Sequence, residues 1–223
     1  MSYDWIYNNY LDYLKEQAPS FFQRLKEQEE LKELYLTIND IFFLCNAFDR
    51  VEMQDKNYFN LIKEFKSYGS RLLLIITLND KYLVDVMLRL LVEKLYRILY
   101  GLHRPELAES SIRKHEKRKM KERLEGFVLK QEELNNLYSD YSELLHHTTP
   151  TVTDLLNFRE LMEADTEIIN YTIEKVKIIR DIFIEDCFFK SFDTVELGLA
   201  TSMNLNNNLQ EITIQKLVGK SLL

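Results

Sequence analysis

Five polar residues stand at spacings that could bring chemical groups together on helices. Arg89 and Glu93 interrupt the most apolar part of the chain, LVDVMLRLLVEKLYRILY, and are four residues apart. On a helix they share a face and can form an ion pair. Tyr138, Ser142 and His146 also repeat every four residues, so a helix places these three hydrogen-bonding side chains in one line.

Two interpretations of these five residues remain open. In the catalytic interpretation, His146 is a general acid or base and Arg89 stabilises an anion such as a phosphorane. In the structural interpretation, the same side chains form a polar network that fixes the register of two packed helices, and Arg89 and Glu93 form an ordinary salt bridge.

A basic run lies between these two groups. Its cations are Arg113, Lys114, Lys117, Arg118, Lys119, Lys121 and Arg123. Two acids, Glu116 and Glu122, leave the run at +5, and the whole chain carries −7, so the rest of the chain carries −12. The run is either a solvated helix face or a site for RNA phosphates or a protein partner. Because no aromatic residue interrupts it, base stacking on single strands is not favoured.

Composition excludes several classes of site. The 223 residues include only five glycines and three prolines, and no glycine-rich phosphate loop, HExxH, CxxC or GxSxG motif occurs. The adjacent His146 and His147 would point about 100° apart on a helix and could not bind one ion together. We therefore expect no metal and no cofactor. Cys45 and Cys187 both lie in apolar runs, which predicts buried, reduced thiols.

The N-terminus predicts no export of the chain. Acidic residues occur early, a basic leader region is missing, and no apolar run approaches the length of a membrane span. We expect a cytoplasmic protein without a membrane-bound part.

Apolar residues recur at helical spacing through almost the whole chain, which predicts an all-α fold. We expect a single helical bundle of four to five core helices (71–192), an N-terminal helical extension (1–70) and a C-terminal tail with a short helix (193–223). The expected helices cover residues 2–18, 20–48, 55–78, 81–100, 105–126, 130–147, 163–189 and 209–217. The first should bury Trp5 and Tyr13, Gly69 should bend the third, and Gly101 should cap the fourth.

The order of the two motifs resembles the HEPN-like helical proteins. A helix of the form R-x-x-x-E (Arg89, Glu93) is followed by a variable charged segment and then by Y-x-x-[aromatic/aliphatic]-S-x-x-x-H, from Tyr138 to His146. The likeness covers roughly residues 70 to 190. It implies a bundle of four to five helices that forms a homodimer, in prokaryotic toxin–antitoxin, abortive-infection or other phage-defence systems.

The resemblance also implies a possible reaction. Active members are metal-independent ribonucleases with an R-x(4–6)-H motif at the dimer interface. The literal match is Arg97 with His103, although Ile98 replaces the usual polar residue and Gly101 is expected to end the helix before His103. Arg89 with His146 is the alternative pair, from separate helices.

Two functions follow from these observations. One is a non-catalytic interaction or regulatory subunit of a defence or toxin–antitoxin-type system, with a protein partner from the same system. The other is a metal-independent ribonuclease effector that binds RNA and uses the arginine and histidine.

Overall fold

Every regular element in the described part of the chain is a helix, as expected. The computed structural model describes residues 3–25, 27, 29–49, 56–147, 166–193 and 197–223, without the side chains of Tyr3, Asp4, Lys117 and 142–147. The elements are α1 (Tyr3–Gln17), α2 (Pro19–Leu25), α3 (Glu29–Phe48), α4 (Phe59–Ile75), η1 (Ile76–Leu78), α5 (Lys81–His103), α6 (Glu109–Lys114), α7 (Lys117–Leu124), α8 (Gln131–His147), α10 (Thr166–Ile182), η3 (Phe183–Phe188), α11 (Phe189–Phe192), α12 (Leu199–Asn208) and α13 (Glu211–Val218).

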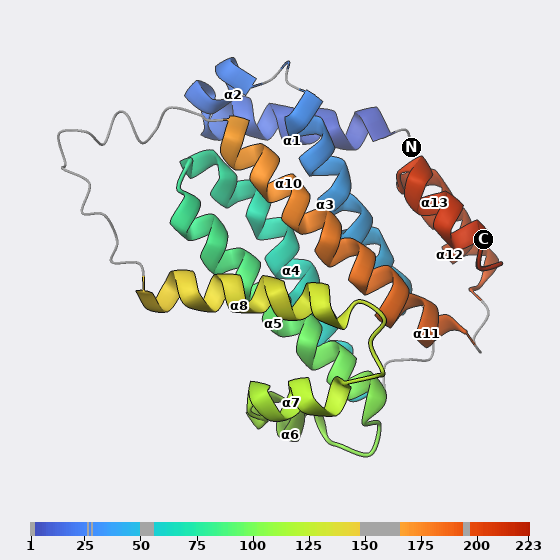
Figure 1. Ribbon diagram of the computed structural model, residues 1–223. Coiled ribbons are helices and arrows are strands. Elements are labelled where there is room, and N and C mark those ends of the chain that lie inside the picture. The colour runs from blue at the N-terminus through green and yellow to red at the C-terminus, as the bar shows by residue number, and fades with distance from the viewer. Residues whose placement is uncertain (1–2, 26, 28, 50–55, 148–165, 194–196) are drawn as a thin grey trace.

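Helices α3, α4, α5, α8 and α10 pack against one another in the middle of the molecule (Figure 1). Helix α10 packs on α3, α3 on α4, α4 on α5, and α8 crosses α5. Helices α1 and α2 cover one end of the bundle, α6 and α7 lie at the opposite end, and α12 and α13 lie along one side. One hydrophobic cluster runs through all of these layers, from Leu14 in α1 to Leu217 in α13. The boundary expected near residue 70 lies within α4, whose residues belong to this cluster.

The turn between η1 and α5 forms as its sequence predicts. Asn79 adopts a left-handed conformation (φ 50°), and the Asp80 carboxylate accepts a hydrogen bond from the Leu83 amide at 3.1 Å. Asparagine and aspartate tolerate these two roles because their short polar side chains bind nearby backbone groups. The turn reverses the chain, so that α5 packs along α4.

Two glycines behave differently from the prediction. Helix α4 continues through Gly69, and α5 continues past Gly101 to His103. A Cβ at residue 101 would lie 2.9 Å from the Tyr58 Cβ and 3.0 Å from the Ile112 Cδ1, whereas at residue 69 the nearest atom would be 3.9 Å away. Gly101 therefore permits close packing of α5 rather than ending it. Gly126, by contrast, has φ +79° and does interrupt the helical chain after α7.

Some expected helices differ in extent or orientation. The segment expected at 20–48 is divided into α2 and α3, and the charged helix expected from Pro105 begins only at Glu109. The asparagine-rich segment, for which no helix was predicted, forms α12. Helix α1 buries Tyr7, Tyr10 and Leu14, while Trp5 and Tyr13 are exposed, so its buried face is rotated from the predicted one.

Both cysteines are buried and free, as the apolar sequence around them predicts. Burial raises the pKa of the Cys45 thiol and that of the Cys187 thiol, so neither favours the thiolate form. Among the described helices, none is both long enough and apolar enough to cross a lipid bilayer.

Candidate functional site

Helices α5 and α8 bring together two of the residues predicted for the site. The Arg89 guanidinium lies over the Tyr138 ring, 6.0 Å from its centroid. The Tyr138 ring meets the Tyr96 ring edge-on at 5.8 Å, and the Tyr96 hydroxyl donates a hydrogen bond to Asn135 Oδ1. Burial raises the pKa of Tyr96, so this hydroxyl keeps its proton and acts as a donor. The contact joins the two helices that carry the predicted motifs.

Glu93 forms its ion pair with Arg97, one turn beyond it on α5. The Arg97 guanidinium lies 3.1 Å from Glu93 Oε1 and also donates to the carbonyl oxygens of Ile112 and Arg113, at 2.8 and 2.7 Å. These carbonyls belong to the last turn of α6, where a helix lacks internal donors. Glu93 lies four residues from both Arg89 and Arg97, and the contacts of Arg97 with α6 hold its guanidinium beside Glu93.

The literal R-x(4–6)-H match does not form a convergent pair. Residues six apart on one helix lie about 120° apart around its axis, so Arg97 and His103 face different neighbours. Arg97 binds α6, whereas the His103 ring packs against Phe127 at 5.2 Å. The His103 Nε2 atom is buried and has no hydrogen-bond partner among the described residues. Burial, followed by the positive charge of Lys190, lowers the pKa of His103, while Asp186 opposes this shift.

The side chains of Ser142 and His146 lie outside the described part of the structure, although α8 is helical through His147. Their backbone positions still limit what they can reach. At 1.5 Å per residue, Ser142 and His146 lie about 6 and 12 Å beyond Tyr138 along the helix axis. The Arg89 guanidinium lies over Tyr138, so the backbone of His146 is two helical turns away from the ring that this cation covers.

A buried carboxylate that the sequence analysis missed lies one turn before Arg89. Asp85 is 3% exposed; its carboxylate accepts a hydrogen bond from the Tyr171 hydroxyl at 2.7 Å and pairs with Lys81 at 2.8 Å. The Lys81 Nζ also lies 4.2 Å from the centroid of the Tyr171 ring. Burial and the Asp85 charge raise the pKa of Tyr171, so its hydroxyl stays a donor and connects α10 to α5.

Tyr141 lies in the same polar region, where α5 and α8 meet next to α10. We call this region the α5–α8 seam; it contains Asp85, Arg89, Tyr96, Tyr138, Tyr141 and Tyr171. The Tyr141 hydroxyl is buried and makes no hydrogen bond of good geometry among the described residues. Burial raises the pKa of Tyr141, and the nearby Tyr171 raises it further. The sequence feature that could have indicated this site is Asp85, an acid between two valines that lies four residues before Arg89 on the same helix face.

The basic run is partly neutralised by its own surroundings. Arg113 pairs with Glu64 and Glu109, Arg118 with Glu122, and Lys119 with Glu116. Arg123 donates to the Tyr100 hydroxyl at 2.8 Å. Lys114 and Lys121 are exposed and make no ion pair with any residue that the structure describes, while the Lys117 side chain is outside the description. The cations at residues 114 and 121 are therefore those with most capacity for phosphate or an acidic partner.

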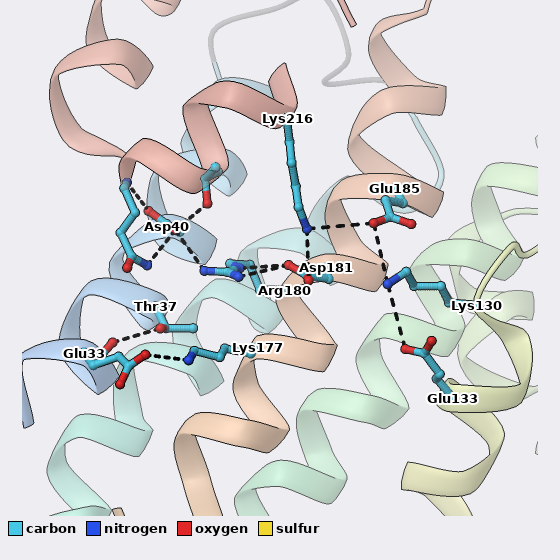
Figure 2. Close-up of polar contacts among 12 residues, drawn as sticks. Glu33, Thr37, Asp40, Lys130, Glu133, Lys177, Arg180, Asp181, Glu185 and Lys216 are labelled. Atoms are coloured by element: carbon cyan, nitrogen blue, oxygen red, sulfur yellow. Dashed lines mark hydrogen bonds and ion pairs between the residues drawn. The ribbon is translucent and has the colours of Figure 1, made fainter. Parts of the chain in front are cut away.

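A second polar centre, which the sequence analysis did not identify, fastens the C-terminal helices to the bundle (Figure 2). The fully buried Asp40 of α3 accepts hydrogen bonds from the Gln210 amide at 2.9 Å and the Thr213 hydroxyl at 2.7 Å, at the start of α13. Arg180 of α10, 5% exposed, lies 3.3 Å from the same carboxylate. Burial raises the pKa of Asp40, while Thr213, Gln210 and Arg180 oppose this shift. Next to Asp40, Asn39 donates to the Asn208 carbonyl at the end of α12.

Asp186 has the corresponding role at the start of α8. Its fully buried carboxylate accepts hydrogen bonds from the backbone amides of Leu129 at 2.7 Å and Lys130 at 3.2 Å. It therefore binds amides that the start of a helix leaves without internal acceptors. Lys190 lies 3.3 Å from the same carboxylate and donates to the Phe127 carbonyl. Asp186 thus connects η3 to the helix that carries Tyr138.

Comparison with known proteins adds no further assignment. No protein-family model, no curated protein and no solved structure matches this chain. Within the described ranges, no group of three or more histidine, cysteine, aspartate or glutamate residues is arranged to hold a metal ion.

Proposed function

We propose that this chain is a helical interaction or regulatory subunit of a bacterial defence or toxin–antitoxin-type system, built on a HEPN-like bundle and acting as a homodimer. The choice of system rests on the resemblance of the two motifs, R-x-x-x-E and Y-x-x-[aromatic/aliphatic]-S-x-x-x-H. The contact between Arg89 and Tyr138 supports the resemblance, because the helices that carry the motifs pack together.

The observation that carries the non-catalytic function is the use of the polar groups around the predicted site. Asp85 binds Lys81 and Tyr171, Arg97 binds the end of α6, and Tyr96 binds α8 through Asn135. The contacts of Tyr171, Arg97 and Tyr96 join α5 to other helices, and the contact of Lys81 with Asp85 lies within α5. A catalytic arginine or carboxylate would instead need to face a substrate.

Exposed apolar side chains support a surface for protein–protein interaction between α1, α3 and α4, away from the predicted site. A groove of about 430 Å³ between α1, α3 and α4 is lined by Tyr13, Phe42 and Leu74, whose exposed fractions are 41%, 36% and 46%. Ser67 and Arg71 lie at its polar edge. Large apolar side chains that gather at one groove are typical of surfaces that a protein partner covers. In this proposal the groove is the homodimer interface.

Sedimentation velocity of the purified chain tests the dimer. We expect a species of twice 26.8 kDa, and Phe42→Asp should shift it to the monomer by placing a charge in the groove. Leu199→Asp on α12 is the matched control, because Leu199 is exposed but lies outside the groove. A monomer at all concentrations, together with no complex on co-expression with the proteins encoded beside this chain, would refute the interaction function.

The alternative function is a metal-independent ribonuclease that uses Arg89 and His146. Arg89 lies over Tyr138, and α8 continues from Tyr138 to Ser142 and His146, which favours the ribonuclease. The distance of two helical turns between Tyr138 and His146 disfavours the joint action of both groups on one phosphate within a single chain.

A further inference from the structure

A cavity of about 1150 Å³ lies away from the α5–α8 seam, where η3 and α11 face α13. Residues of α11, α13 and the chain that follows α13 form its walls, and Leu129, just before α8, lies at one side. It is slightly larger than the usual sites for small organic molecules, which measure about 300–1,000 Å³, so a small ligand would fill only part of it.

Polar contacts, some partly exposed and some buried, hold the walls of this cavity in place. Lys216 of α13 lies 2.9 Å from Asp181 and 3.9 Å from Glu185, which fixes α13 against α10 and η3 (Figure 2). Asp40 holds the start of α13, and Asp186 holds the backbone at Leu129. Walls that are fixed before a ligand arrives reduce the entropy cost of binding.

One side of the cavity is apolar. Phe189 and Phe192 of α11 contribute to the lining, together with Leu197, just before α12, and Leu222, beyond α13. Leu129 also lines the cavity, although 78% of it is exposed to solvent. A ligand with an apolar body would remove this surface from water, which favours binding in proportion to the area covered.

The charged groups of the lining differ in what they already bind. Lys190 pairs with Asp186, and Lys216 pairs with Asp181 and Glu185. Lys220 lies 5.7 Å from the centroid of the Phe189 ring and, within the described ranges, pairs with no carboxylate. The acids of the lining are Glu185, which pairs with Lys130 and Lys216, and Asp193, which an anion would have to avoid. A cation that pairs with no carboxylate of the described residues therefore lies beside the aromatic wall.

We infer that this cavity binds a small anionic amphiphile, a molecule with one acidic group and an apolar body. The acidic group binds the Lys220 ammonium, with Lys216 as the next cation, and the apolar body packs on Phe189, Phe192 and Leu197. The inference does not depend on the proposed function, because it uses none of the residues of the α5–α8 seam or of the α1–α3–α4 groove.

The fluorescent probe 1-anilinonaphthalene-8-sulfonate has this chemistry and tests the inference on the full chain. We expect saturable binding by the folded protein, and Lys220→Glu should weaken it at least tenfold. Lys63→Glu is the matched control, because Lys63 is also exposed, lies over an aromatic ring (Phe59, 4.3 Å) and is outside the cavity. A second variant, Gln215→Trp, fills the cavity from an exposed position and should abolish binding.

Competition identifies the ligand class. Decanoate should displace the probe if the natural body is aliphatic, and 1-naphthoate if it is aromatic, whereas dodecyltrimethylammonium should displace neither. Thermal melting of each variant confirms that it is folded. The inference is overturned if the folded protein binds no probe, if Lys220→Glu and Lys63→Glu have equal effects, or if the cationic amphiphile competes as well as the anions.

Discussion

At the scale of single residues, polar side chains of this protein serve mainly to join helices. Asp40, Asp85 and Asp186 are almost completely buried, and each accepts hydrogen bonds from a different element. A buried carboxylate loses its hydration, and it is stable only where several donors replace the water. These carboxylates therefore fix where α13, α10 and α8 meet the rest of the bundle.

The hydrogen bond between Tyr171 and Asp85 provides a direct test of this role. Tyr171→Phe should lower the free energy of unfolding by about 1.5–3 kcal/mol, because it removes a hydrogen bond to a buried charged acceptor. Tyr82→Phe is the control, since Tyr82 is exposed, and it should change stability by less than about 0.5 kcal/mol. Urea denaturation measures both. Equal small effects would show that the Tyr171 contact contributes nothing.

His103 should make stability depend on pH. Because burial and Lys190 lower its pKa in the folded protein, the unfolded chain binds a proton more readily than the folded chain does. Stability should therefore fall as the pH drops below about 6.5, the ordinary histidine value. His103→Gln should remove this part of the dependence in urea denaturation between pH 5 and 8. Parallel curves for the two proteins would contradict the assignment.

At the scale of elements, helix positions depend on a few close approaches and helix-end contacts. Gly101 lets α5 approach Tyr58, and Asp40 holds the start of α13. The apolar periodicity of the sequence predicted most helices, because this periodicity determines which face is buried. It could not predict that Gly101 packs rather than caps, since this depends on Tyr58, which is distant in the sequence. Helix α12 was missed because its asparagines carry little apolar pattern.

A pair of glycine substitutions tests the packing role of Gly101. Gly101→Ala should destabilise the protein by about 1–3 kcal/mol, because its Cβ would lie 2.9 Å from the Tyr58 Cβ. Gly69→Ala, also within a helix but with its nearest neighbour at 3.9 Å, should stabilise by about 0.5–1 kcal/mol. Thermal melting distinguishes the two directions. If both substitutions stabilise the protein, the close approach of α5 and Tyr58 is not a constraint.

Asp40 provides the test for the C-terminal helices. Asp40→Asn should lower the free energy of unfolding by about 1.5–3 kcal/mol, because Arg180 would keep only the Asp181 carboxylate, and Gln210 and Thr213 would lose a charged acceptor. Hydrogen exchange should accelerate first in α13, because the Asp40 carboxylate accepts a hydrogen bond from the Gln210 amide just before this helix. Asp12→Asn, an exposed acid in α1, serves as the control and should leave both measurements unchanged. If hydrogen exchange in Asp40→Asn accelerates equally in all helices, Asp40 does not specifically hold α13 in place.

At the scale of the whole molecule, one continuous core extends from α1 to α13. The sequence predicted the all-α class and the break between two helices at residues 79–80. It did not predict the ion pair of Glu93 with Arg97, which depends on the contacts of Arg97 with α6. Buried charges such as Arg180 were missed for a similar reason, since their partners are far away in the sequence.

The central claim, that the seam between α5 and α8 is structural, is tested most directly by incubating labelled RNA with the purified protein in EDTA. We predict that the RNA remains intact at protein concentrations at which the chain is folded, and that Arg89→Ala changes only stability. Cleavage of the RNA by the wild-type protein, lost in folded Arg89→Ala and folded His146→Ala variants, would contradict the claim and establish the ribonuclease.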